Sequence, residues 1–351
     1  MSRQNIRHLS LDQIREYFSQ VGEKPFRADQ VYQWLWQKHA SSFSEMTNLP
    51  ASLRASLELQ FDFQPLREEL VQVSGDGTVK TRFILRDGEL VEGVMIPSGE
   101  RSTACISSQV GCSLGCRFCA TGYMGRKRNL DFDEIYDQVA LINKQSLARQ
   151  ERKLTNIVLM GMGEPLLNYN NVLKAIEQIT APHGLAMSPR RITLSTAGIA
   201  KMIRKMGEDQ VRFNLALSLH AGNDEKRSRI MPINDSNGLD SLVMALNEFY
   251  RLTSNEITFE YILLKDFNDS DLDAADLVRI YRRVPVKVVN VIQYNSIDRG
   301  GFAGTGEKRT EEFIAYLSNN RVNARLRRSR GKDIDAACGQ LANKSTAGTL
   351  S

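Results

Sequence analysis

Three cysteines lie within eight residues of this chain, Cys112, Cys116 and Cys119, with the spacing C-x3-C-x2-C. Structural zinc is usually held by four protein ligands, and an iron–sulfur cubane usually takes four thiolates. Three closely spaced thiolates would therefore leave one corner of a cubane without a protein ligand. Because another molecule can bind at an open metal position, the spacing predicts a catalytic 4Fe–4S site. The alternatives are a zinc site completed by a distant Cys or His, or buried cysteines that bind nothing.

The two remaining cysteines, Cys105 and Cys338, lie outside this segment. Cys105 precedes Cys112 by seven residues, on a predicted strand. Cys338 lies in the glycine-bounded stretch 331–341, which has neither helical nor strand periodicity. Such a stretch predicts an ordered loop that can fold over a cleft. From composition alone, a free cysteine is most often a small buried apolar residue.

Composition is typical of an enzyme of the cytoplasm. The 351 residues include 42% hydrophobic and 25% charged residues, which are ordinary globular values. Five cysteines, three of them clustered, do not indicate a disulfide framework and fit a reducing compartment. No apolar run reaches the roughly 20 residues of a membrane helix, and the first residues lack the apolar core of a signal peptide. We therefore expect a cytoplasmic protein with no membrane partner.

Basic residues gather beside both cysteine regions, although the net charge of +5 is mild. Arg126, Lys127 and Arg128 follow the cysteine segment, and six cations fall within residues 321–332. Such clusters suit a polyanionic substrate, because each phosphate contact releases counterions. A solvated surface is the alternative. The six are Arg321, Arg325, Arg327, Arg328, Arg330 and Lys332.

A strand–helix alternation surrounds the cysteine segment and runs nearly to the end of the chain. Six such units predict a parallel sheet with right-handed crossovers, and we expect an α/β fold, a partial six-unit (β/α) barrel. The expected strands are Thr103–Ser108, Asn156–Met160, Arg191–Ser195, Phe213–Leu219, Ile257–Leu263 and Lys287–Ile292. The expected helices are Asp131–Gln145, Asn171–Thr180, Leu239–Tyr250, Leu272–Arg282 and Glu311–Ser318.

The rest of the chain divides around this barrel. Residues 1–75 predict a small helical accessory domain that binds RNA, with helices at 11–18, 25–39 and 50–59. Residues 76–100 predict a β-hairpin connector that turns at Asp87-Gly88. The barrel takes residues 101–330, and residues 331–351 form the loop with Cys338 and a flexible tail.

Small, polar or glycine residues follow the predicted strands. Active sites of parallel α/β barrels are built from loops at the carboxyl ends of the strands, so these residues are candidate cofactor contacts. Glu164 could pair with an ammonium group, and glycines beside it allow close backbone approach. A lone histidine such as His220 is as often a satisfied core residue. The candidates are Gly161, Gly163, Glu164, Ser195, Ser218, Leu219, His220 and Asn295.

Together these motifs resemble one enzyme family. The combination of C-x3-C-x2-C, GMGEPLLN, LSTAG, SLH and RGKDIDAACGQL is similar to the dual-specificity RNA adenine-C2 methyltransferases of the radical S-adenosylmethionine superfamily. The resemblance spans roughly residues 90–341 and extends more weakly to the helical N-terminal part. It implies that Cys112, Cys116 and Cys119 hold one 4Fe–4S cluster and that S-adenosylmethionine chelates the fourth iron.

The resemblance also implies substrates and partners. Members of the family methylate an adenosine of 23S ribosomal RNA in the peptidyl transferase centre and the adenosine 3′ to the anticodon in certain tRNAs. Two S-adenosylmethionine molecules are used for each methyl group transferred. An electron donor such as a flavodoxin-type protein is expected, and the enzyme is expected to be a monomer.

Specific roles follow for three further residues. By resemblance, Cys338 accepts a methyl group from one S-adenosylmethionine and carries it to carbon 2 of adenine, leaving a covalent protein–RNA thioether. Cys105 then helps to resolve this adduct, which ends in a disulfide between the two cysteines. Glu92 matches the position of a proton acceptor, although alone it would be interpreted as an ordinary strand carboxylate.

The sequence departs from the family pattern in places and leaves alternatives open. The neighbours of Asn295 in residues 291–296 differ from the commoner ones, and residues 299–304 diverge. A sister group methylates carbon 8 of the same rRNA adenosine and usually has alanine at the position of Pro165, so Pro165 favours carbon 2. A non-catalytic, metal-stabilised RNA-binding protein is the alternative of a different class.

Overall fold

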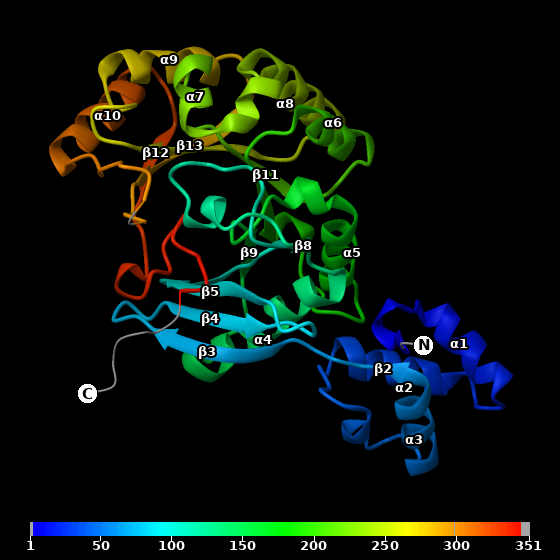
Figure 1. Ribbon diagram of the computed structural model, residues 1–351. Helices are drawn as coiled ribbons and strands as arrows, with labels where there is room; N and C mark the ends of the chain where they lie inside the picture. Colours follow the sequence, from blue (N-terminus) through cyan, green and yellow to red (C-terminus); the bar gives the residue numbers. More distant parts are fainter. Residues whose placement is uncertain (1–2, 298, 345–351) are drawn as a thin grey trace, which may run out of the picture.

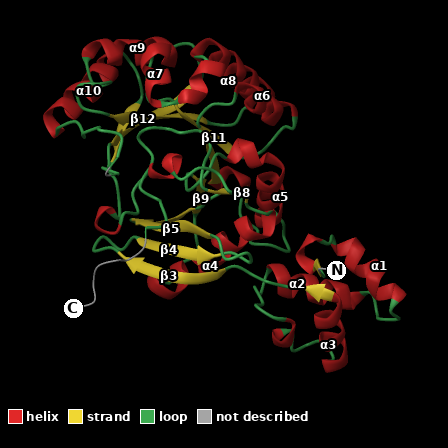
Figure 2. Cartoon of the chain, viewed as in Figure 1, coloured by secondary structure: helices red, strands yellow, loops and turns green. Residues whose placement is uncertain are grey.

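A ten-stranded sheet forms the centre of the computed structural model, which describes residues 3–297 and 299–344 (Figures 1 and 2). The strand order is β14-β13-β12-β11-β10-β9-β6-β5-β4-β3. The strands from β6 to β14 run parallel, whereas β3, β4, β5 and β6 pair antiparallel. Their bounds are β3 Arg67–Val73, β4 Val79–Ile84, β5 Leu90–Ser98, β6 Arg101–Cys105, β9 Asn156–Leu159, β10 Ile192–Thr196, β11 Asn214–Ser218, β12 Ile257–Leu263, β13 Val286–Gln293 and β14 Ala324–Arg327.

Helices between the parallel strands lie along the outer side of the curved sheet, and the segment that carries the cysteines lies inside the curve (Figure 1). Apolar residues of strands and helices form one continuous core. The helices are α4 Phe132–Gln150, α5 Tyr169–Thr180, α6 Ala200–Glu208, α7 Asp224–Ile230, α8 Leu239–Thr253, α9 Asp271–Tyr281 and α10 Glu307–Asn319. This arrangement confirms the predicted α/β class with a partial barrel.

Four elements differ from the prediction. β14 adds a seventh parallel strand within the basic stretch, and α6 and α7 were not expected. β3 lies inside the region predicted to be helical, where it pairs antiparallel with β4. Both β3 and β14 are edge strands with charged residues on exposed faces, so neither shows the apolar alternation that identifies a half-buried strand.

The N-terminal part contains the helices α1 Leu11–Gln20, α2 Phe26–Trp36 and α3 Ala51–Gln60 (Figure 1, blue), and Trp36 of α2 packs against Phe132 and Tyr136 of α4. A capping box at Ser10 and Gln13 begins α1. The buried guanidinium of Arg7 donates to Asp137 on α4 at 2.6 Å. In the part of the chain that the structure describes, no helix has the length and apolar character to cross a bilayer.

The turn between β3 and β4 contacts the loop that follows β14. The Gly331 N–H donates to Asp76 at 3.0 Å, and Asp333 accepts from the Ser74 hydroxyl at 2.6 Å. This turn therefore fixes the start of the Cys338 loop. The predicted flexible tail, residues 345–351, lies outside the described residues.

Candidate active site

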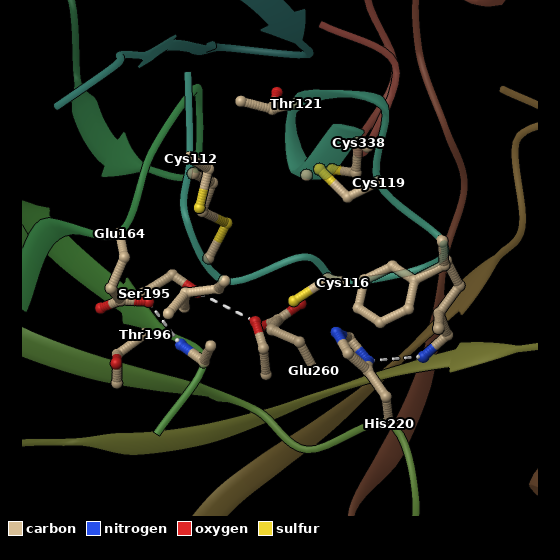
Figure 3. A pocket seen from close by; sticks show the side chains of 18 of the residues that line it. Cys112, Cys116, Cys119, Thr121, Glu164, Ser195, Thr196, His220, Glu260 and Cys338 are labelled. Carbon is tan, nitrogen blue, oxygen red and sulfur yellow. Dashed lines mark hydrogen bonds between the residues drawn. The ribbon is translucent and has the colours of Figure 1, made fainter. Parts of the chain in front are cut away.

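The three clustered cysteines lie on the loop that follows β6 and line a cavity of about 150 Å³ (Figure 3). The loop folds tightly back on itself beside Gly122. A Cβ atom built on Gly122 would lie 2.7 Å from the Cys116 carbonyl oxygen, so a larger residue would push the loop open. The chain therefore presents all three thiols to one cavity.

The thiols fit an iron–sulfur cluster better than a single zinc ion. Thiolates on one tetrahedral zinc would lie about 3.8 Å apart, since each Zn–S bond is about 2.3 Å. Among the described residues, no three cysteines place their sulfur atoms all within 4.8 Å of one another. The wider spacing suits thiolates that bind separate irons. All three thiols are free.

Burial opposes ionisation of these thiols. It raises the pKa of Cys112 to about 11 and that of Cys116 well above its usual value, and the Cys119 sulfur raises both pKa values further. Burial also raises the pKa of Cys119. A cationic group in the cavity would offset this cost, because metal binding draws the proton from a thiol.

The first predicted cofactor contacts lie at the end of β9. Glu164 is buried, with one oxygen accepting from the Ala197 N–H at 2.8 Å and the other from the Leu166 N–H at 3.1 Å. Burial raises its pKa. Gly161 and Gly163 line the cavity as expected, but a Cβ on Gly163 would lie 2.5 Å from Gln109. Position 163 therefore requires glycine, because it packs closely against Gln109 in the segment after β6.

Ser195, Ser218 and His220 line the same cavity from the ends of β10 and β11. The two serine hydroxyls lie 3.5 Å apart. The His220 Nδ1 accepts the Ile262 N–H at 3.1 Å, which leaves the proton on Nε2. Burial lowers the pKa of His220 to about 3, so the ring is a neutral hydrogen-bond donor.

Cys338 lies between two adjoining cavities. It lines the cavity of the clustered cysteines and a second cavity of about 90 Å³, which Cys105 also lines. Figure 3 places Cys338 beside Cys119. The Gly339 carbonyl accepts from the Ala120 N–H at 2.7 Å, which ties the two loops together. Burial raises the pKa of the Cys105 thiol to about 12.

Two charged residues that the sequence did not single out for the site, Arg327 and Glu260, line the first cavity. Arg327 on β14 lines both cavities, and its Nη1 lies 3.2 Å from a carboxylate oxygen of Glu260 on β12. The sulfur of Cys338 and the Glu260 carboxylate raise the pKa of Arg327, which keeps it charged. We expected Arg327 among RNA phosphate anchors on the surface; its side chain instead lines the cavities, and its contact with RNA stays a prediction. The strand alternation of β14 turns Arg327 inward.

Buried Arg227 is a third residue that the sequence did not indicate. Its guanidinium donates to the carbonyl oxygens of Ala197 at 2.5 Å and Leu219 at 3.1 Å. It thereby joins the ends of β10 and β11 behind the cysteine loop. In the sequence, Arg227 is one arginine in a short charged segment, and such segments are common on surface helices.

Three predicted residues do not line either cavity. The Leu219 side chain is fully buried in the core. The Asn295 amide donates to the Ser329 hydroxyl at 2.9 Å, and its buried oxygen has no partner among the described residues. The Glu92 carboxylate accepts from backbone N–H groups of the Cys338 loop. The structure therefore brings together the cysteines, Glu164, Ser195, Ser218 and His220, but leaves these three outside.

Known proteins match both parts of the chain. The family model for the ribosomal RNA large subunit methyltransferase N-terminal domain matches residues 4–62, and that for the radical SAM superfamily matches residues 106–278. A probable dual-specificity RNA methyltransferase RlmN of Cytophaga hutchinsonii is 54% identical over 97% of this chain and 93% of its own length. Dual-specificity RNA methyltransferase RlmN 2 of Myxococcus xanthus is 43% identical over 97% and 91%.

The fold agrees with these matches. The crystal structure of a radical SAM methyltransferase from Sphaerobacter thermophilus superimposes with a TM-score of 0.91 at 36% identity, covering 96% of this chain and 99% of that one. The sequence relatives, the domain models and this structure agree over nearly the whole chain. The chain therefore belongs to the radical S-adenosylmethionine superfamily and, within it, to the RlmN family of dual-specificity RNA methyltransferases.

Proposed function

We propose that this chain methylates carbon 2 of an adenosine in 23S rRNA, and of the adenosine 3′ to the anticodon in some tRNAs. Family membership makes it a radical SAM RNA methyltransferase that uses a 4Fe–4S cluster and S-adenosylmethionine. The observation that carries the finer proposal is the position of Cys338, which faces the clustered cysteines on one side and Cys105 on the other.

The residues around the first cavity fit the cofactors. Cys112, Cys116 and Cys119 would hold three irons, and Glu164 would accept from the ammonium group of S-adenosylmethionine at the fourth. When bound and reduced, the cluster supplies the electron that cleaves S-adenosylmethionine to a 5′-deoxyadenosyl radical. A flavodoxin-type protein is the proposed donor of that electron. Ser195, Ser218 and neutral His220 offer hydroxyl and N–H groups suited to ribose or adenine.

The cysteine pair accounts for methyl transfer to a carbon that is not nucleophilic. Cys338 first receives a methyl group from one S-adenosylmethionine. Removal of a hydrogen atom from this S-methyl group leaves a carbon radical, which adds to carbon 2 and joins the RNA to the protein. The radical adduct would then lose the carbon 2 proton, for which Glu92 is the proposed acceptor, and one electron, which would return to the oxidised cluster. Attack by Cys105 on the Cys338 sulfur then releases methylated RNA and leaves a disulfide.

The test is anaerobic incubation of the reconstituted monomer with an rRNA fragment or tRNA, labelled S-adenosylmethionine and reductant, followed by nucleoside mass spectrometry. We expect 2-methyladenosine from both RNAs. Labelled 8-methyladenosine would assign the chain to the sister group instead, despite Pro165. Stoichiometric zinc with no product would favour the metal-stabilised RNA-binding protein.

Arg327 and Arg328 should have separable effects, because Arg327 lines both cavities and pairs with Glu260, whereas Arg328 is exposed and borders only the second of these two cavities. Arg327→Ala leaves the buried Glu260 carboxylate without its cation, so turnover should fall by about 100-fold. Arg328→Ala should lower the slope of RNA affinity against salt by about one unit for a lost phosphate contact. Turnover kinetics and salt titrations measure the two effects. Equal salt slopes for wild type and Arg328→Ala would place Arg328 on a solvated surface.

A further inference from the structure

The Glu92 carboxylate is directed at the end of the Cys338 loop. Glu92 is the third residue of β5 and is 2% exposed. One of its oxygens accepts from the backbone N–H groups of Ala342 at 2.9 Å and Asn343 at 3.2 Å. The buried Lys80 ammonium on β4 lies 3.6 Å from the other oxygen. Both oxygens are thus engaged away from the cleft.

Resting on the function proposed above, we propose that Glu92, held in place by Lys80, positions the loop so that Cys338 stays between the two cavities. Ala342 is only four residues from Cys338, so a shift at this contact moves the thiol. Hydrogen bonds to an ionised acceptor are shorter and stronger than neutral ones. A buried carboxylate also loses its hydration, which makes each of these bonds costly to break.

The Cys338 loop is held at both ends. The contacts at Glu92 hold its C-terminal end, and other contacts hold its N-terminal end. Asp76 and Asp333 join residues 331–333 to the turn between β3 and β4. The Asn343 amide adds a bond to the Leu90 carbonyl at 2.7 Å, next to Glu92. Between these two ends, Thr121 donates to the Leu341 carbonyl at 2.7 Å. Cys338 therefore lies in the middle of a span anchored on both sides.

This anchoring restricts when Glu92 can act on a substrate. The oxygen that accepts from Ala342 and Asn343 is occupied while the loop is docked, and the other oxygen faces Lys80. Glu92 can accept a substrate proton only after the end of the loop has moved. Glu92 therefore positions the loop first and accepts the substrate proton later. The positioning is needed while Cys338 is being methylated, a step in which no RNA takes part.

Glu92→Ala, Glu92→Gln and Lys80→Met test the proposal, with exposed Glu100→Gln as the matched control. Hydrogen exchange of the apo protein reports the amides of residues 339–344, and peptide mass spectrometry reports methylation of Cys338 without RNA. In Glu92→Ala we expect exchange at Ala342 and Asn343 to accelerate about tenfold or more and Cys338 methylation to slow by a similar factor. Glu92→Gln, which keeps an acceptor but not the charge, should lie between Glu92→Ala and wild type.

Lys80→Met should change both measurements in the same direction as Glu92→Ala while leaving Glu92 present. Exchange within about twofold of wild type in Glu92→Ala would overturn the proposal. Faster exchange with an unchanged rate of Cys338 methylation would overturn it as well, since the loop would not then position the thiol. If wild type never methylates Cys338, the proposed function fails, whereas hydrogen exchange still decides whether Glu92 anchors the loop.

Discussion

Replacement of Cys105 by alanine should trap the protein on its RNA. The proposed steps before resolution require the cluster, S-adenosylmethionine and Cys338, and Cys105 lines only the second cavity. Cys105→Ala should therefore still methylate Cys338 and form the thioether to adenine, but it should not release the product. A denaturing gel should show a nuclease-sensitive mass shift, and peptide mass spectrometry should place the RNA on Cys338.

Cys338→Ala is the matched variant, because it removes the methyl carrier and leaves Cys105 in place. It should give neither the adduct nor methylated RNA, with product at least about 10⁴-fold below wild type. Normal turnover by Cys105→Ala would contradict a resolving role for that thiol. Methylated RNA from Cys338→Ala would contradict the carrier role, and with it the whole two-cysteine scheme.

The strands of the barrel were predictable because their burial leaves a strong signal in the sequence. Five of residues 257–263 are apolar and they follow the polar pair Asn255-Glu256, and β12 has the predicted bounds. A central parallel strand is covered on both faces, so it needs such an apolar segment. The long helix α4 follows a capping box at Asp131 and Glu134, and it extends five residues beyond the predicted end, to Gln150.

The elements that the sequence did not indicate are short or lie at an edge. β14 contains two arginines in four residues, and one of them pairs with a carboxylate two strands away. Only the tertiary arrangement makes this pairing visible, because Glu260 and Arg327 are 67 residues apart in sequence. Charged residues at an edge strand are otherwise indistinguishable from a solvated surface segment.

Some residues of the candidate site could be predicted from the sequence and others could not. Strand-end residues such as Ser195, Ser218 and His220 could be predicted together, because the carboxyl ends of parallel strands share one edge of the sheet. The placement of Glu92 could not be predicted, because β5 is antiparallel and its side chain contacts a loop 250 residues later. Long-range contacts of that kind depend on loop paths that local patterns do not encode.

Replacement of Cys112, Cys116 and Cys119 together by alanine should remove the iron while leaving the fold. The three residues lie on a loop outside the strands and helices, whereas the apolar core lies within those elements. We expect no bound iron, no cluster absorbance and no methylated RNA. The melting temperature should fall by no more than a few degrees, because about 1 kcal/mol of lost stability lowers it by only about 2–4 °C in a chain of this size.

The control for this triple variant is Cys105→Ala, which removes a buried thiol near the site but none of the three proposed ligands. It should keep its iron and its absorbance after anaerobic reconstitution. Circular dichroism of the triple variant distinguishes the two outcomes, because the main core of the helices does not include residues 112–123, and among the described helical residues only Ile230 of α7 packs with Ala120 in a separate cluster. If the helical signal disappears together with the iron, the metal holds the fold, and the open coordination position inferred from the three thiols would have to be abandoned.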